Sequence, residues 1–194
     1  MKDMDDFLYL ASQSPRRRQL LDQIQVSYQV LAIDIEEAVL PEETAEAYVQ
    51  RVALDKALAG LLLRTQDKLV LAADTEVVLE GKVLGKPSDQ AHAQEILRSL
   101  SGRDHQVLSA VAIHDGERHQ IRLSRNIVYF RDLSTTEINR YWSSGEPHGK
   151  AGAYAIQGLG AAFIKRLEGS YSSVMGLPLY ETAALLAEFG WNIV

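Results

Sequence analysis

The 194-residue sequence contains no cysteine, which excludes a disulfide framework, a thiolate zinc site and a cysteine nucleophile. Long apolar runs are missing as well, because stretches such as residues 57–63 fall well short of the roughly 18 residues that a membrane span requires. The first six residues are acidic, whereas a signal or transit peptide would be basic. We therefore expect a cytoplasmic protein with no membrane partner.

Positive charge is also scarce. The chain has 20 Lys and Arg residues against 26 Asp and Glu residues, which gives a formal net charge of -6 at pH 7. Nucleic-acid binding relies on counterion release by clustered Lys and Arg side chains, so we expect no nucleic-acid partner. An anionic ligand would have to be held by a local pocket.

The chain shows no internal repeat, low-complexity tract or proline-rich linker, and its 5 prolines and 13 glycines are scattered as turn residues. This pattern predicts a single domain over residues 1–194. Helical and strand patterns alternate along the chain, but hairpins interrupt them. The fold class that we expect is therefore α/β, with a mixed sheet and flanking helices.

Capping signals place several helices. Ser14 with Pro15, Ser88, and the capping box from Ser134 to Glu137 each predict a helix start. Helices are expected at residues 14–24, 44–64, 88–100, 134–144 and 179–189, and strands at 7–11, 28–33, 68–73, 76–84 (a hairpin turning on residues 80–81), 106–113, 120–130 and 162–167.

The segment Ser12 to Arg18 joins a strand to a helix N-terminus and so combines free backbone N–H groups, hydroxyls and positive charge. Proteins hold phosphate with such groups. Only Arg16 and Arg17 would lie near the turn, and Arg18 would face solvent. The segment alone leaves open a capped surface helix with a solvated basic run.

A predicted strand at residues 68–73 ends in Asp74 and Thr75, which is the usual place for a ligand site in an α/β sheet. A carboxylate there can bind a divalent metal or accept a proton from water, and an Asx turn or hairpin cap is the alternative. Glu76, two residues further on, is predicted to lie at the surface.

Other polar groups are weaker candidates. Residues 34–37 form an acidic stretch that, taken alone, is typical of a solvated loop, but with Asp74 it would suit Mg²⁺ or Mn²⁺. Lys56 and Lys86 are isolated cations with a default role in solubility, although Lys86 lies between a glycine and a proline. Gln157 lies in the glycine-rich stretch 145–160, where its amide could read a base edge or satisfy its own backbone.

Several short segments follow one another between about Tyr9 and Glu181: Leu10–Arg17, Glu36–Glu37, Lys56–Ala57, Ala73–Thr75, Gly85–Pro87, Lys150–Tyr154, Ile156–Gly158 and Gly176–Pro178. In their residues and their order, these segments together resemble the Maf family of nucleoside triphosphate pyrophosphatases. The resemblance implies a dimeric cytoplasmic enzyme with two lobes around a central cleft in an elongated mixed sheet. It also implies cleavage between the α and β phosphates of a nucleoside triphosphate.

The resemblance also implies roles for single residues. Asp74 matches the family's proton acceptor, and Glu37 matches a carboxylate that binds metal or positions water. We expect Asp74, Glu37 and the substrate phosphates to hold Mg²⁺ or Mn²⁺ as the cofactor. Four residues match groups that line the triphosphate pocket: Ser12, Arg17, Lys56 and Lys86.

Arg16, Thr75 and Gln157 are similar to the branch of the family that acts on dTTP and UTP. A uracil or thymine edge presents two carbonyl acceptors and an N–H donor, which an arginine and a primary amide can meet. Two alternatives remain open. One is a pyrophosphatase that removes damaged or purine triphosphates, and the other is a nucleotide-binding regulator of cell division.

Overall fold

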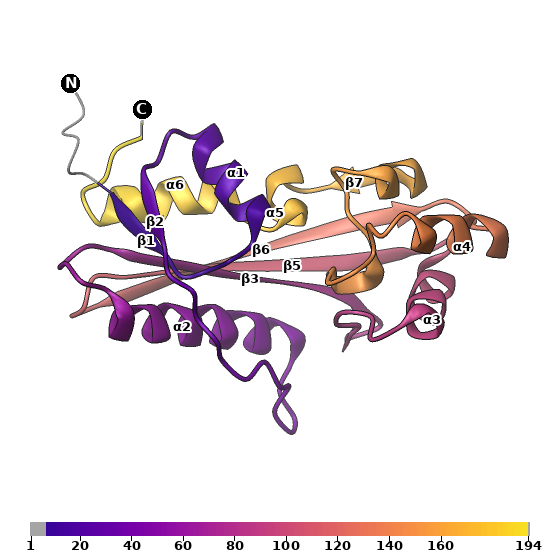
Figure 1. Cartoon of the computed structure of the whole chain (residues 1–194), viewed down its shortest axis with the longest axis horizontal. Coiled ribbons are helices and arrows are strands. Elements are labelled where there is room, and N and C mark those ends of the chain that lie inside the picture. Colours follow the sequence, from indigo (N-terminus) through magenta and orange to yellow (C-terminus); the bar gives the residue numbers. More distant parts are fainter. Residues whose placement is uncertain (1–6, 194) are drawn as a thin grey trace. The chain divides into compact units, whose positions relative to one another are not determined.

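The computed structural model describes residues 7–193, and within them it contains a seven-stranded sheet in the order β2-β1-β3-β5-β6-β7, with β4 paired to β3 (Figure 1). Strand β1 runs parallel to β2 and β3, whereas β4 pairs antiparallel with β3 and β7 antiparallel with β6. The predicted mixed sheet is confirmed. The strands are β1 Leu8–Leu10, β2 Tyr28–Val30, β3 Val70–Leu79, β4 Lys82–Val83, β5 Asp104–His114, β6 His119–Phe130 and β7 Ile164–Glu168.

Helices flank this sheet, as predicted. None of those formed by residues 7–193 is both long enough and apolar enough to span a membrane. The α-helices are α1 Pro15–Gln23, α2 Ala45–Leu63, α3 Gln90–Leu100, α4 Thr135–Ser143, α5 Tyr171–Met175 and α6 Leu179–Glu188, and two 3₁₀ helices are η1 Ala151–Ala153 and η2 Leu159–Phe163.

The chain divides into two compact units. Unit 1 contains the described residues up to Asp74, Ser109–Ser124 and those from Gly176 onward, and unit 2 contains Thr75–Leu108 and Arg125–Met175. Strands β3, β5 and β6 contribute residues to both units. The two predicted lobes agree with this division, while the single domain over residues 1–194, the elongated outline and the central cleft stay predictions.

In unit 1, α2 covers one face of the sheet, and α1 and α6 cover the other (Figure 1). Helix α2 approaches the strands closely at Gly60, where an added Cβ would lie 2.7 Å from the Val70 side chain and 2.9 Å from that of Ala11. Any larger residue would therefore push the helix away from the sheet. Residues 70–73 at the start of β3 are fully buried, which explains their uninterrupted apolar sequence.

Unit 2 has its own core, built largely from aromatic rings. Phe130 meets Tyr154 edge to face with ring centroids 4.8 Å apart, and Tyr141 meets Phe163 in the same way at 4.9 Å. The four rings are at least nine-tenths buried. Edge-to-face pairs add to the stabilisation that comes from burying apolar area, so this cluster fixes the position of the loops attached to it.

Several local signals are confirmed. Helix α1 has Ser14 as its N-cap residue with proline at the first position, although the Ser14 side chain makes no cap hydrogen bond. The capping box of α4 is complete, because Ser134 and Glu137 each bond to the other's backbone N–H. Residues 80 and 81 both have positive φ and join β3 to β4 as a two-residue hairpin turn.

The prediction that Ser88 caps α3 is wrong. The N-cap residue is Asp89, whose carboxylate accepts a hydrogen bond from His92 N at 2.8 Å. Ser88 instead donates its own backbone N–H to the His92 ring at 3.2 Å. Asp89 directly precedes the first helical residue, so its side chain alone reaches the third backbone N–H of the helix.

The prediction that a strand ends at Asp74 is also wrong, because β3 continues through this residue to Leu79. Thr75, Val77 and Val78 are β-branched and favour a continued strand. Glu76 was expected at the surface, but it is 5% exposed. The prediction failed because a carboxylate that follows an apolar run usually indicates the end of a strand.

Candidate active site

Asp74 lies beside the end of a neighbouring strand. Strand β1 pairs with β3 through Leu10 and Leu71, and Ala11 N donates to Leu71 O at 2.8 Å before the chain turns away. Asp74 thus lies just beyond the carboxyl end of β1, although its own strand continues. Parallel α/β sheets place ligands at the carboxyl ends of their strands. Asp74 therefore lies at such an end, as expected, but the strand that ends there is β1 and not its own strand β3.

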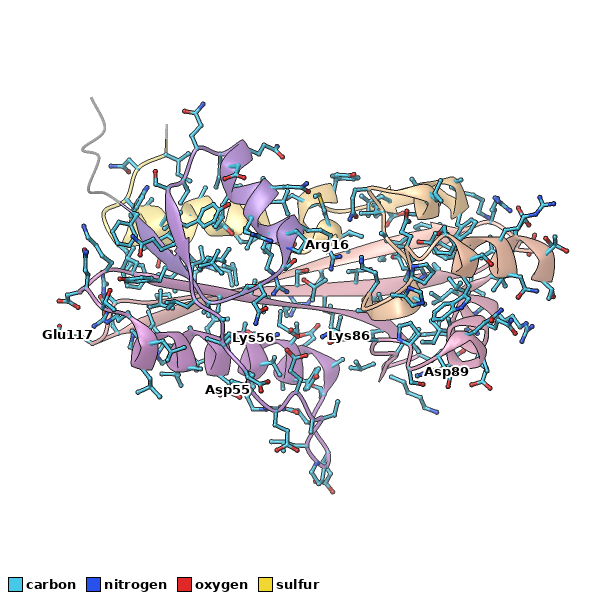
Figure 2. All side chains as sticks on the ribbon, viewed as in Figure 1. Arg16, Asp55, Lys56, Lys86, Asp89 and Glu117 are labelled. Atoms are coloured by element: carbon cyan, nitrogen blue, oxygen red, sulfur yellow. The ribbon has the colours of Figure 1, made fainter. Side chains whose placement is uncertain are left out.

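A buried ammonium joins the two predicted carboxylates. Lys56 Nζ lies 2.7 Å from Asp74 Oδ1 and 2.6 Å from Glu37 Oε1. Figure 2 shows Lys56 on the side of α2 that faces the sheet and its neighbour Asp55 on the outer side. The interpretation of Lys56 as a surface cation is wrong, since the residue is 6% exposed. A charge buried this deeply requires charged partners, which Asp74 and Glu37 provide.

The second carboxylate oxygen of Asp74 has no partner. Asp74 Oδ2 is buried and, within the part of the chain that the structure describes, accepts no hydrogen bond. Leaving a buried acceptor unsatisfied costs about 1–3 kcal/mol. Such an atom in a native structure therefore needs an explanation, and a catalytic role is one. This oxygen is positioned to accept a proton or to bind a cation.

The donor set suits a small divalent cation that also binds phosphate. Among residues 7–193, no three or more His, Asp or Glu side chains group together so as to hold a metal by themselves. Mg²⁺ commonly takes one or two protein carboxylates and fills its other positions with water and substrate phosphates. Asp74 and Glu37, which share one ammonium partner, fit that requirement.

The N-terminus of α1 provides the predicted anion-binding groups. Arg17 Nη1 donates to Ser12 Oγ at 3.0 Å, and Arg17 Nε donates to Gly176 O at 2.9 Å. Ser12 Oγ also accepts from Ser14 N at 3.3 Å, so the hydroxyl, the guanidinium and the helix start form one group. The structure thus brings Ser12 and Arg17 together, as the sequence predicted.

The adjacent arginines have different environments. Arg18 is exposed, as predicted, whereas Arg16 is half-buried on the first turn of α1. Burial lowers the pKa of Arg16 from its usual value, and the nearby charge of Arg17 lowers it further. Arginine nevertheless stays protonated in proteins, so the first turn of α1 carries two positive charges close together.

Residues 34–43, here called the Glu37 loop, are fastened to α2. Tyr48 donates its hydroxyl to Glu37 O at 3.3 Å, and Arg51 donates to Ala38 O at 2.8 Å. Arg51 also binds both carboxylate oxygens of Glu43, at 2.7 and 2.8 Å, and this hydrogen bonding is the main reason why the pKa of Glu43 falls to about 2. Sequence reasoning missed Arg51 and Glu43, because charged residues beside a helix are usually solvated.

Lys86 belongs to unit 2 and is exposed. Its neighbour Gly85 has φ +64° and accepts a hydrogen bond through its carbonyl from Gly152 N at 2.9 Å. Gly152 itself has φ +68°, and a Cβ there would lie 2.6 Å from the Val77 side chain. The backbone that carries Lys86 is therefore tied to the segment around Gly152, where only glycine fits.

The other two predicted residues of unit 2 differ in exposure. Thr75 follows Asp74 in β3 and is half-buried, whereas Gln157 is exposed at a turn closed by a hydrogen bond from Gly158 N to Ala155 O. The structure brings together five of the predicted residues within unit 1, as one pair and one triad. These are Ser12 with Arg17, and Lys56 with Glu37 and Asp74.

These features define a class of site before any relative is considered. A buried carboxylate with one free oxygen, a second carboxylate, an ammonium and an arginine-bearing helix start occur together at the edge of a mixed α/β sheet. Such groups can accept a proton from water and can bind phosphate oxygens. They are the functional groups expected of a hydrolase that acts on a phosphorylated ligand.

Comparison with known proteins places the chain in a family. The family model described as "Maf-like protein" matches residues 7–189, and the chain belongs to the Maf family. A dTTP/UTP pyrophosphatase of Methylococcus capsulatus is 53% identical over 98% of this chain and 94% of its own length. That of Nitrosomonas europaea is 50% identical over 96% of each chain, and that of Chromobacterium violaceum is 46% identical over the whole of both. A solved dITP/XTP pyrophosphatase from Mycobacterium abscessus is a more distant likeness, with 17% identity over 93% of each chain and a TM-score of 0.47.

Proposed function

We propose that this chain is a nucleoside triphosphate pyrophosphatase that hydrolyses dTTP and UTP to the nucleoside monophosphate and pyrophosphate. Relatives named for that activity are about half identical to it over nearly their whole length. The observation that carries the chemistry is Asp74. Lys56 holds one of its carboxylate oxygens, while the other is buried and accepts no hydrogen bond from residues 7–193.

Asp74 acts as the general base in this proposal. Its free Oδ2 takes a proton from a water molecule, whose oxygen then forms a bond to the α phosphorus. The bond from the α phosphorus to the oxygen that bridges it to the β phosphorus breaks, and pyrophosphate leaves with that electron pair. Lys56 fixes Asp74 through its other oxygen, so the base does not have to reorient during the reaction.

Asp74 and Glu37 would also hold Mg²⁺ or Mn²⁺ together with the substrate phosphates. When bound, the cation supplies positive charge that offsets the charge of the triphosphate. Glu37 lies on an irregular loop and has a side chain that is 29% exposed, so it stays accessible to a hydrated ion. Lys56 contacts Glu37 through Oε1 and Asp74 through Oδ1.

The remaining predicted residues bind the rest of the substrate. Ser12 and Arg17 offer a hydroxyl and a guanidinium to phosphate oxygens, and Lys86 adds a third group for the triphosphate. Arg16, Thr75 and Gln157 are proposed to select the base. A cytoplasmic homodimer, which the resemblance implies, is part of the same proposal.

Rates and products on four substrates test the function. With Mg²⁺ or Mn²⁺ present, we expect dTTP and UTP to be hydrolysed faster than ITP and 7-methyl-GTP, and phosphorus NMR to show pyrophosphate as the product. Orthophosphate as the first product would contradict the proposed bond cleavage. Faster turnover of ITP would favour the removal of damaged or purine triphosphates, and binding without metal-dependent turnover would favour a regulator.

A further inference from the structure

A partly buried carboxylate in unit 2, Glu146, binds the loop that carries Gln157, here called the 155–160 loop. Glu146 Oε1 accepts hydrogen bonds from the Tyr141 hydroxyl at 2.7 Å and from Gly160 N at 3.0 Å. Glu146 Oε2 accepts a third from Leu159 N at 2.8 Å. One side chain therefore fixes the C-terminal end of this loop.

The Tyr141 hydroxyl fixes the other end. It donates to Glu146 and accepts a buried hydrogen bond from Ala155 N at 3.0 Å. Gln157 lies between the two attachment points. The acid and the phenol together hold both ends of the backbone segment that carries Gln157.

The fit around this pair is tight. A Cβ added at Gly160 would lie 2.7 Å from the Tyr141 hydroxyl, and one added at Gly158 would collide with the Glu146 carboxylate. Both glycines therefore let the loop backbone approach the pair closely. A side chain at Gly158 would displace the Glu146 carboxylate, and one at Gly160 would also meet the backbone oxygen of Ala155 at 2.8 Å.

The protonation states of the pair are fixed as well. Burial and the hydrogen bond to Glu146 raise the pKa of Tyr141, so the phenol stays a donor at neutral pH. Burial raises the pKa of Glu146, but hydrogen bonds from Gly160 N, the Tyr141 hydroxyl and Leu159 N outweigh it and leave the pKa below its usual value. The carboxylate is therefore a pure acceptor facing three donors.

We propose that Tyr141 and Glu146 are positioning residues that hold the 155–160 loop in the conformation in which Gln157 selects the nucleobase. This inference rests on the proposed function, because it concerns how the same enzyme distinguishes dTTP from a purine triphosphate. The pair acts through Gln157 and does not take part in the hydrolysis. Its loss should alter the preference among bases more than the chemical step.

A matched pair of variants separates positioning from stability. Tyr141→Phe keeps the ring against Phe163 but removes the hydroxyl that joins Glu146 to Ala155 N. Tyr154→Phe also removes a buried hydroxyl in unit 2, one that bonds to His105 Nε2 at 2.8 Å outside the loop attachment. Both lose a buried hydrogen bond, but only the first releases the 155–160 loop.

The test compares kcat and KM for dTTP and ITP in the wild type and both variants. We expect Tyr141→Phe to lower the preference for dTTP over ITP, as a ratio of kcat/KM, by about tenfold through a higher KM for dTTP. The kcat on ITP should change by less than about twofold. Tyr154→Phe should show a similar fall in melting temperature and an unchanged preference.

The inference would be overturned if Tyr141→Phe and Tyr154→Phe had the same ratio of kcat/KM for dTTP over ITP. An equal loss of kcat/KM on both substrates in Tyr141→Phe would overturn it as well. If Tyr141→Phe does not fold, Glu146→Gln gives the same measurement, because its NH₂ group would face Leu159 N–H while its carbonyl still accepts from Tyr141. A wild-type chain that hydrolyses neither substrate would remove the proposed function itself. A wild type that prefers dTTP, together with an unaltered Tyr141→Phe, removes only the inference.

Discussion

The Glu37 loop of unit 1 and the 155–160 loop of unit 2 each carry one predicted functional side chain, but different forces hold them. Charge pairs around Arg51, whose side chain is 27% exposed, fasten the Glu37 loop, and Lys56 binds Glu37 itself. Hydrogen bonds to the buried phenol of Tyr141 and the partly buried carboxylate of Glu146 fasten the 155–160 loop. Salt screens charge pairs near the surface, whereas it has less effect on a buried hydrogen bond between uncharged groups, such as the one from Ala155 N to the Tyr141 hydroxyl.

The two loops depend on different numbers of contacts. The Glu37 loop has several attachments of small individual strength and one strong buried contact through Lys56. The 155–160 loop depends on a single pair of side chains, so one substitution there has a local and specific effect. Substitutions that each remove one contact therefore distinguish attachment by charge pairs from attachment by hydrogen bonds.

The largest effect is expected from Lys56→Met. The substitution removes the ammonium and leaves Asp74 buried without its charged partner, so the free energy of unfolding should fall by about 3–5 kcal/mol. Urea denaturation at pH 7 measures this. As a control, Asp55→Asn on the outer side of the same helix should have little effect. Equal losses in both variants would show that Lys56 does not anchor the triad.

The second largest effect is expected from Asp74→Asn, which keeps the shape of the side chain but removes the base. We expect kcat on dTTP to fall by about 10²-fold or more. Asp67→Asn, at a side chain of unit 1 that is 88% exposed, provides the matched control and should keep the wild-type rate. A kcat for Asp74→Asn within a few-fold of the wild type would exclude Asp74 as the proton acceptor.

Acid should weaken unit 2 through His105. Burial lowers the pKa of this histidine to about 4, whereas an unfolded histidine has a pKa near 6.5. Between these values the unfolded state binds more protons, so stability is lost as the pH falls from 6.5 towards 4. We expect a loss of roughly 2 kcal/mol between pH 7 and pH 5, measured by urea denaturation. His105→Gln should show a flatter profile, and an identical slope would contradict this assignment.

The smallest effect is expected from Arg51→Met, which releases the Glu37 loop from Glu43. We expect kcat/KM to fall by less than about fivefold in low salt, because ion pairs near the surface contribute little. The kcat/KM of Arg51→Met, divided by that of the wild type, should approach one as salt is added, because salt screens the same charges in the wild type. The ratio of Tyr141→Phe to wild type should not change with salt. A common salt dependence would break the comparison between the loops.

Local sequence signals predicted most elements of the fold. Pro15 after Ser14, the capping box at Ser134 and the positive-φ pair at residues 80–81 each act within a few residues, so the sequence contains their whole cause. The helix Tyr171–Met175 was missed, because it is one short turn between two glycines and depends on its neighbours. Burial of Glu76 was missed for the same reason, since tertiary packing decides it.

The site was only partly predictable. The sequence named Asp74, Glu37 and Lys56, but it could not show that one ammonium joins both carboxylates, because the three residues come from a strand, a loop and a helix. Tyr141 and Glu146 gave no signal at all. Their role arises from hydrogen bonds to backbone groups more than ten residues away, and no spacing rule encodes such contacts.

The proposed reaction requires that water attacks the α phosphorus of the triphosphate. Hydrolysis of dTTP in ¹⁸O-labelled water, followed by mass spectrometry of both products, tests it most directly. The account predicts one labelled oxygen in the nucleoside monophosphate and none in the pyrophosphate. Label in the pyrophosphate, with an unlabelled monophosphate, would show attack at the β phosphorus and would contradict the account.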